Sequence, residues 1–289
     1  MDWMHEGFLQ KLSRFKLLHG VSAASIQQGN RRSKNYGTSM EFADFRAYTP
    51  GDDLRQIDWN AFARTNKHYI KRFVNESELE VAIYLDCSKS MSFYSEKWKR
   101  ARQLAAAFAF LALNQEDRAS FIPLSSTTSP LPLRKGKHQL ASFLKAIDAV
   151  RSAEMSLSSA LQAEALKKER RQVRVVISDY FEPLEHCYES LKRLQQKSTT
   201  MLLIQILDEE ELAPSLSGEY KLTDAETMFE KEVAVQKHVL AQYDERLEAH
   251  SEALRNFASS RGIQFIRCSA SNSFEQLLGN QLRRAGWIK

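Results

Sequence analysis

From residue 79 onward, short apolar segments alternate with longer segments of helical periodicity. The pattern predicts strands at 79–86, 118–124, 173–178, 201–207 and 263–267, and helices at 96–114, 137–150, 156–169, 184–196 and 273–285. Segment 128–133 is interrupted by Pro130 and Pro132, which confines it to the edge of a sheet. Strands separated by helices are typical of βαβ units. We therefore predict an α/β fold with a mostly parallel sheet and helices on both faces.

The first 78 residues have a different pattern. A helical period covers residues 2–19, and no acidic residue occurs from Gly7 to Met40. We predict two parts: residues 1–78 form a basic arm and a small element packed on the core, and residues 79–289 form the core, with a long helical segment at 224–261. The basic arm fits either a nucleic-acid or acidic partner or a solvated loop. The acidic run Asp208–Glu211 is interpreted as a solvated face.

Composition excludes several classes of protein. The chain has 41 Lys and Arg against 36 Asp and Glu, a net charge of +5, so any attraction to anionic partners is mild. Its three cysteines form no CxxC pair, which favours a reducing compartment and argues against structural zinc. The apolar run Leu104–Leu113 is about half of what a membrane span needs. Without a signal-peptide pattern at the N-terminus, we expect a cytoplasmic protein without a membrane span.

Hydroxyl and carboxylate side chains gather where two predicted strands end. Asp86, Ser88 and Ser90 follow the first core strand, and Asp179 follows the strand at 173–178. In an open α/β sheet, ligands bind at the carboxyl ends of strands where the strand order reverses. Oxygen ligands suit Mg²⁺. The sequence therefore predicts a shared metal site, with ordinary loop-capping residues as the alternative. Cys87 is interpreted as a buried small residue, because the neighbouring carboxylate disfavours its thiolate.

Two parts of the sequence resemble motifs of known families. Asp86-x-Ser88-x-Ser90 with Ser178-Asp179 resembles the metal-ion-dependent adhesion site of von Willebrand factor A domains. The stretch from Glu41 to Lys71 resembles the signature of domain-of-unknown-function family 58. The resemblance implies a Rossmann-like von Willebrand factor A-type core with a small N-terminal element. It also implies a partnership with a MoxR-type AAA+ ATPase that acts on a client protein.

The expected metal site departs from the adhesion-site pattern at one position. Alignment on Leu157 and Leu161 places Met155 where the pattern has a threonine. A thioether is a poor ligand for Mg²⁺. Ser156 supplies an oxygen there only if the loop shifts by one residue. We therefore expect weak Mg²⁺ binding that Met155→Thr strengthens.

Charged residues between Asp44 and Arg64 form a second cluster in the sequence. We expect their Arg and Asp side chains to pair and to fix the N-terminal element on the core. The signature residues are Asp44, Arg46, Asp52, Asp53, Arg55, Asp58, Trp59 and Arg64.

The function that fits best is non-enzymatic: an interaction module in which Asp86, Ser88, Ser90, Asp179 and, after a loop shift, Ser156 hold Mg²⁺ for a partner's carboxylate. Two alternatives stay open. One is a Mg²⁺-dependent hydrolase that uses metal-bound water. The other is nucleic-acid binding through the basic arm, although few aromatic residues are interleaved there for base stacking. The chain contains no P-loop motif, so we do not expect it to bind ATP through one.

Overall fold

The structure is a computed structural model that describes residues 3–4, 7–18, 40–75, 78–152, 155–224 and 229–289. The chain divides into two compact units. One comprises Met1–Ala24 with Leu79–Lys289, and the other comprises Ser25–Glu78. The predicted boundary near residue 78 therefore matches the end of the second unit, whereas the first 24 residues group with the core. Within the described ranges, no helix has the length and apolar character to cross a membrane.

The core unit contains a six-stranded sheet in the order β10-β7-β6-β3-β4-β5. All neighbouring pairs are parallel except β4 with β5. The strands are β3 (Glu80–Asp86), β4 (Arg118–Leu124), β5 (Leu131–Lys135), β6 (Arg171–Ser178), β7 (Ser198–Leu207) and β10 (Gln264–Ser269). The predicted mostly parallel sheet is confirmed, and the proline-interrupted segment is its antiparallel edge strand.

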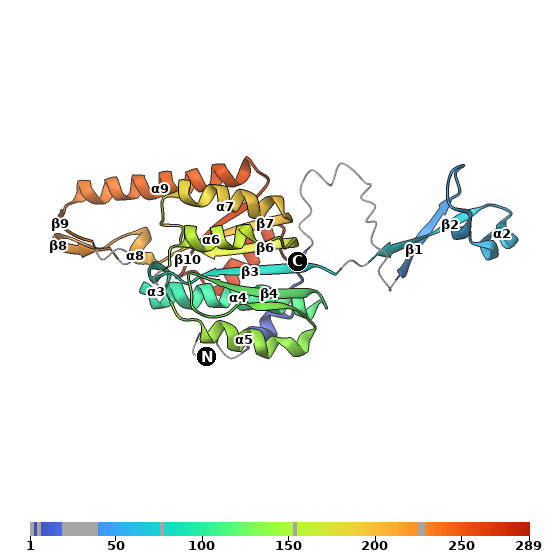
Figure 1. The fold of residues 1–289 in the computed structure, drawn as a ribbon, viewed down its shortest axis with the longest axis horizontal. Helices are drawn as coiled ribbons and strands as arrows, with labels where there is room; N and C mark the ends of the chain where they lie inside the picture. Colours follow the sequence, from blue (N-terminus) through green and yellow to red (C-terminus); the bar gives the residue numbers. More distant parts are fainter. Residues whose placement is uncertain (1–2, 5–6, 19–39, 76–77, 153–154, 225–228) are drawn as a thin grey trace. The chain divides into compact units, whose positions relative to one another are not determined.

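Helices cover both faces of this sheet (Figure 1). Successive side chains of a strand point to opposite faces. Val81, Ile83 and Leu85 of β3 accordingly pack in the cluster that contains α4, while Ala82 and Tyr84 pack in the cluster of α6, α7 and α9. The helices are α1 (Phe8–Leu12), α3 (Lys89–Phe93), α4 (Ser95–Asn114), η3 (Lys137–Gln139), α5 (Leu140–Ala149), α6 (Leu157–Leu166), α7 (Leu184–Gln196), α8 (Glu209–Leu212), α9 (Lys237–Ser259), α10 (Phe274–Gln276) and η4 (Leu277–Leu282).

The N-terminal segment contacts the core unit at two places. Leu17 forms an antiparallel bridge with Ile288, and the Trp3 indole donates to Asp148 at 2.7 Å. The helix expected over residues 2–19 is only five residues long, because the backbone leaves the helix after Leu12 to make this bridge. The basic-arm residues Arg31, Arg32 and Lys34 lie outside the described residues.

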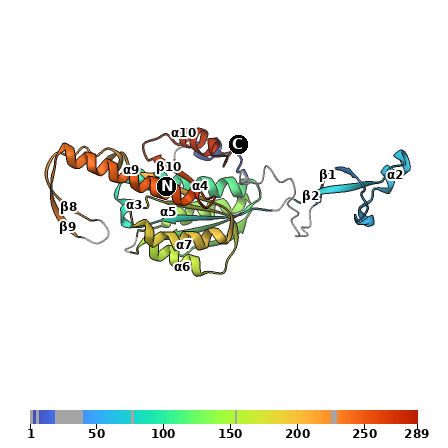
Figure 2. The same cartoon turned by 90° about the horizontal axis from the view of Figure 1, so that it is seen from above.

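The prediction of one helical segment over 224–261 is wrong. β8 (Gly218–Thr223) and β9 (Glu230–Val235) pair as an antiparallel hairpin, and α9 begins only at Lys237. The β-branched residues Val233 and Val235 suit a strand, and the cross-strand pairing of Val233 with Tyr220 outweighs the local helical pattern. Both views place the hairpin beyond the carboxyl edge of the sheet (Figures 1 and 2).

The second unit is built on the antiparallel pair β1 (Met40–Ala47) and β2 (Tyr69–Asn75), joined through η2 (Leu54–Gln56) and α2 (Trp59–Thr65). Its carboxylates fix the connection. Asp53 accepts from the Arg55 amide and caps η2. Asp58 accepts from the amides of Asn60 and Ala61 and caps α2.

Of the expected Arg–Asp pairs, the structure shows Arg46 with Asp52 at 2.8 Å. Asp52 also accepts from the Thr49 amide and hydroxyl, which closes the turn that contains Pro50 and Gly51. Trp59 is 60% exposed in this unit. Arg55 and Arg64 are exposed as well, and the side chain of Asp44 lies outside the described residues. The packing of this element on the core stays a prediction.

The Arg46–Asp52 contact predicts a pH dependence. Hydrogen bonds from Arg46 and then from Thr49 lower the pKa of Asp52 from 3.8 to about 2. A lowered carboxyl pKa stabilises the folded turn above pH 3.8, and this contribution is lost as pH falls through about 2. NMR titration of Asp52 should give a midpoint near 2, and Arg46→Met should move it toward 3.8. Arg64→Met is the control, and a midpoint that Arg46→Met leaves unchanged would contradict the assignment.

Candidate functional site

The site lies where the strand order of the sheet reverses. The chain runs from β3 outward to β4 and β5, then returns to β6 on the other side of β3. β3 and β6 pair in parallel, with Leu85 opposite Ile177. Their carboxyl ends therefore bring Asp86 and Asp179 into one pocket, as the sequence predicts.

Asp86 is buried and held from two sides. Its Oδ2 accepts from the Ser178 hydroxyl at 2.7 Å, and its Oδ1 accepts from the Ser88 amide at 3.0 Å. Burial raises the pKa of Asp86 to about 7, and the charge of Asp179 adds to this rise. The hydrogen bonds from Ser178 and Ser88 oppose the rise without cancelling it. These hydrogen bonds therefore compensate the negative charge of the Asp86 carboxylate only in part.

Ser88 and Ser90 present their hydroxyls beside Asp86, at the start of α3. Their Oγ atoms lie 3.1 Å apart. Neighbouring oxygens around an octahedral Mg²⁺ ion, each about 2.1 Å from the metal, are about 3 Å apart. The two hydroxyls therefore have the spacing of adjacent ligands on such an ion.

Asp179 has a partner that sequence analysis missed. The ammonium of Lys97 lies 3.0 Å from Asp179 Oδ2 and 2.5 Å from Glu211 Oε1. Lys97 is fully buried in α4, while Glu211 belongs to α8. Burial lowers the pKa of Lys97, but the charges of Asp179 and Glu211 outweigh this and leave it raised, so the lysine is protonated.

The loop after β6 is shaped by Tyr180, which is buried and has a left-handed φ of 56°. Such a conformation costs a bulky residue about 1–3 kcal/mol and is common at functional sites. It lets the Phe181 amide donate to Asp179 Oδ1 at 3.3 Å. It also places the Glu182 carboxylate on the amides of Leu157 and Ser158, at the N-terminus of α6.

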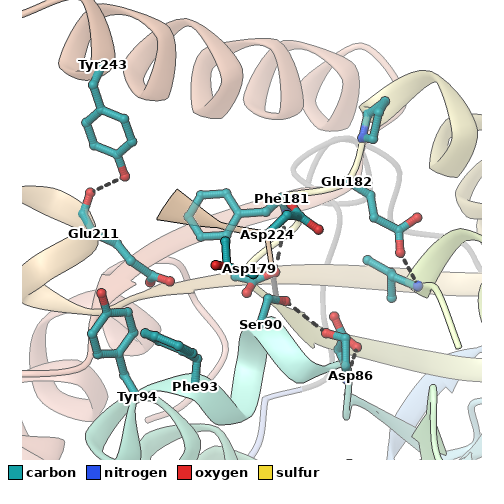
Figure 3. Close-up of a pocket in the computed structure, with 14 residues that line it drawn as sticks. Asp86, Ser90, Phe93, Tyr94, Asp179, Phe181, Glu182, Glu211, Asp224 and Tyr243 are labelled. Carbon is teal, nitrogen blue, oxygen red and sulfur yellow. Dashed lines mark hydrogen bonds between the residues drawn. The ribbon is translucent and has the colours of Figure 1, made fainter. Parts of the chain in front are cut away.

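These residues line a pocket of about 530 Å³. Figure 3 shows Asp86, Ser90 and Asp179 at its centre and Glu182 to one side. Aromatic side chains form part of the wall, and Thr223 and Asp224 of the hairpin region also contribute to the lining. The aromatic residues are Phe93, Tyr94, Phe181 and Tyr243.

Ser156 does not join the predicted metal residues. Its hydroxyl caps α6, accepting from the Ser159 amide at 3.3 Å and donating to the Ser159 hydroxyl at 2.8 Å. Met155 is 50% exposed. Of the described residues 155–157, Leu157 is the one that lines the pocket. A threonine at position 155 would therefore reach the pocket only after a movement of the loop.

The donor set fits a weakly held Mg²⁺ ion. Asp86, Ser88 and Ser90 offer hard oxygens with suitable spacing, and the remaining positions suit water, which Mg²⁺ retains readily. Within the described ranges, no three His, Cys, Asp or Glu side chains group as metal ligands. Hydroxyls, rather than a carboxylate cage, are thus the distinctive part of the set. Asp179 already has Lys97 and the Phe181 amide as partners, which limits what it can offer a metal ion.

The sequence that forms this site matches a known family. The family described as "Protein of unknown function DUF58" matches residues 44–253. The chain belongs to this family. The match contains the signature element, Asp86 and Asp179, and it ends within α9. The family resemblance drawn from the sequence is therefore confirmed.

The chain is also similar to other proteins and to solved structures. Uncharacterized proteins of Mycobacterium bovis and Mycobacterium tuberculosis are each 27% identical over 222 residues, 74% of this chain and 69% of theirs. The structure of BatB from Bacteroides thetaiotaomicron is 13% identical, with a TM-score of 0.41, over 72% of this chain and 98% of that one. A von Willebrand factor type A structure from Catenulispora acidiphila is also 13% identical, with a TM-score of 0.35, over 63% and 44%.

Two signals in the sequence could have revealed the missed residues. Lys97 lies four and seven residues before Ala101 and Leu104 of α4, so it shares their buried face. The run Asp208–Glu211 is not one solvated face. Asp208 is buried and forms a capping box with Glu211, whose side chain turns inward to Lys97.

The helix cap at α6 predicts how Ser156 behaves. Ser156→Ala should lower the free energy of unfolding by about 1 kcal/mol, because it removes an N-cap acceptor. It should leave Mg²⁺ affinity unchanged. Urea denaturation and calorimetric Mg²⁺ titration measure the two quantities. Glu182→Ala, which removes the other acceptor at this helix end, is the matched variant and should behave in the same way. Loss of Mg²⁺ binding in Ser156→Ala would restore Ser156 as a ligand.

Proposed function

We propose that this chain is a non-enzymatic protein-interaction module whose pocket at the switch point binds a partner's carboxylate through Mg²⁺. The observation that carries the proposal is the convergence of Asp86, Ser88 and Ser90 at the junction of β3 and β6. A bound Mg²⁺ would supply a positive charge with coordination positions left for an outside oxygen. The chain's own residues provide the negative charge of Asp86 and two neutral hydroxyls.

Binding is favoured over hydrolysis by the state of the carboxylates nearby. A hydrolase needs a general base that can take a proton from water. Asp179 and Glu211 are paired with Lys97, and Glu182 caps α6. Asp86 is the ligand expected to be charged at the site. Each of these carboxylates is thus engaged in an ion pair, a helix cap or the expected metal site, which makes it a poor general base.

The carboxylates of this pocket repel phosphate, so the pocket itself does not suit a nucleic acid. Nucleic-acid binding through the basic arm stays the alternative. The partner class comes from the family resemblance: a MoxR-type AAA+ ATPase, with this chain as adaptor to a client. All three cysteines are unpaired and buried, in keeping with the reducing, cytoplasmic setting included in this proposal.

The proposal predicts the effect of removing the charge of Asp86. Both Asp86→Asn, which keeps the shape and an acceptor oxygen, and Asp86→Ala should weaken association with the MoxR-type ATPase at least about tenfold in Mg²⁺. Asp86→Asn should leave the melting temperature equal or higher, because burial already opposes the charge. Pull-down and thermal unfolding check the two outcomes.

Asp244→Asn, at an exposed position of α9, is the matched control and should bind as wild type. A folded Asp86→Asn protein that binds the ATPase normally would contradict the metal-site interface. Loss on combined Arg31→Ala and Arg32→Ala, without loss on Asp86→Asn, would assign the contact to the basic arm.

A further inference from the structure

Lys97 places a buried ammonium against two carboxylates that line the pocket. Its side chain is fully buried, and its ammonium bridges Asp179 at the end of β6 and Glu211 in α8. The ammonium also lies 5.4 Å from the ring centroid of Phe181 and 5.8 Å from that of Tyr94. Carboxylates and aromatic faces thus enclose the charge on several sides.

This arrangement bears on the metal site because Asp179 is one of its expected residues. The Phe181 amide occupies Asp179 Oδ1, and Lys97 occupies Oδ2. One carboxylate cannot fully neutralise an ammonium and a dication at the same time. Because Lys97 and Asp179 are buried, charges beside them are weakly screened, and the two cations also repel each other.

We propose that Lys97 determines the metal affinity of this pocket: its ammonium neutralises Asp179 in the metal-free protein and keeps Mg²⁺ binding weak. This inference rests on the proposed function, since it concerns the same site. Lys97 then supplies the positive charge that a tightly bound metal ion would otherwise provide beside Asp179. Glu211 gives the ammonium a second partner, to which it stays bound when Mg²⁺ draws on Asp179.

The test compares Mg²⁺ binding and thermal stability in wild type and Lys97→Met, which keeps the length of the side chain and removes its charge. Calorimetric titration should show Mg²⁺ affinity increased at least about tenfold in Lys97→Met. Without metal, the melting temperature of the variant should fall, because the buried Asp179 and the partly buried Glu211 lose their partner. Added Mg²⁺ should raise that temperature more than it raises the wild-type value.

Lys99→Met is the matched control, since Lys99 lies in the same helix but pairs with Glu96 at the surface. It should leave both Mg²⁺ affinity and the Mg²⁺-dependent shift unchanged. If Lys97→Met does not fold, Lys97→Met with Glu211→Gln replaces it, because one of the two stranded charges is then removed. The double variant should show the same increase in affinity.

A folded variant with wild-type Mg²⁺ affinity, or one whose loss of stability Mg²⁺ does not reverse, would make Lys97 purely structural and overturn the inference. Repeating both titrations in Asp86→Asn separates the two proposals. If wild type binds Mg²⁺ through Asp86 and Lys97→Met changes nothing, the inference alone fails. If neither wild type nor Lys97→Met binds Mg²⁺, the metal-dependent function fails with it.

Discussion

The parallel pairing of β3 with β6 is the constraint on which the rest of the site depends. It sets Leu85 opposite Ile177, so each strand delivers its next polar residues to the same point. Asp86 and Asp179 are thereby buried in one pocket, where two negative charges repel and neither is well hydrated. The hydrogen bonds to Asp86 and the ion pair of Asp179 partly offset this concentration of negative charge.

The protein compensates the two carboxylates in different ways. Asp179 receives a buried ammonium, while Asp86 receives a hydroxyl and an amide, which carry no net charge. Burial therefore raises the pKa of Asp86, with the charge of Asp179 as a further cause. A proton or a cation relieves the remaining energetic cost at Asp86. This asymmetry makes Asp86, rather than Asp179, the carboxylate that an added cation would stabilise more.

The periodicity of the sequence was sufficient to predict the sheet, the helices on both faces and the meeting of Asp86 with Asp179. It failed at Glu230–Val235, where strand pairing across the β8–β9 hairpin outweighs local helical preference. For Ser156, the sequence left a ligand role open after a loop shift, and the structure shows that its hydroxyl caps α6. Capping and ligation use the same serine oxygen, so residue type alone could not separate them.

The sequence by itself determined which strands are buried, where they end and which oxygens stand at those ends. These properties follow from local pattern and from the rule that parallel strands share a carboxyl edge. Tertiary structure alone decided that Lys97 of α4 and Glu211 of α8 meet Asp179. They are 114 residues apart in the chain, and their contact exists only because α4 and α8 pack against the same end of the sheet. The electrostatic balance of the site was therefore set by packing.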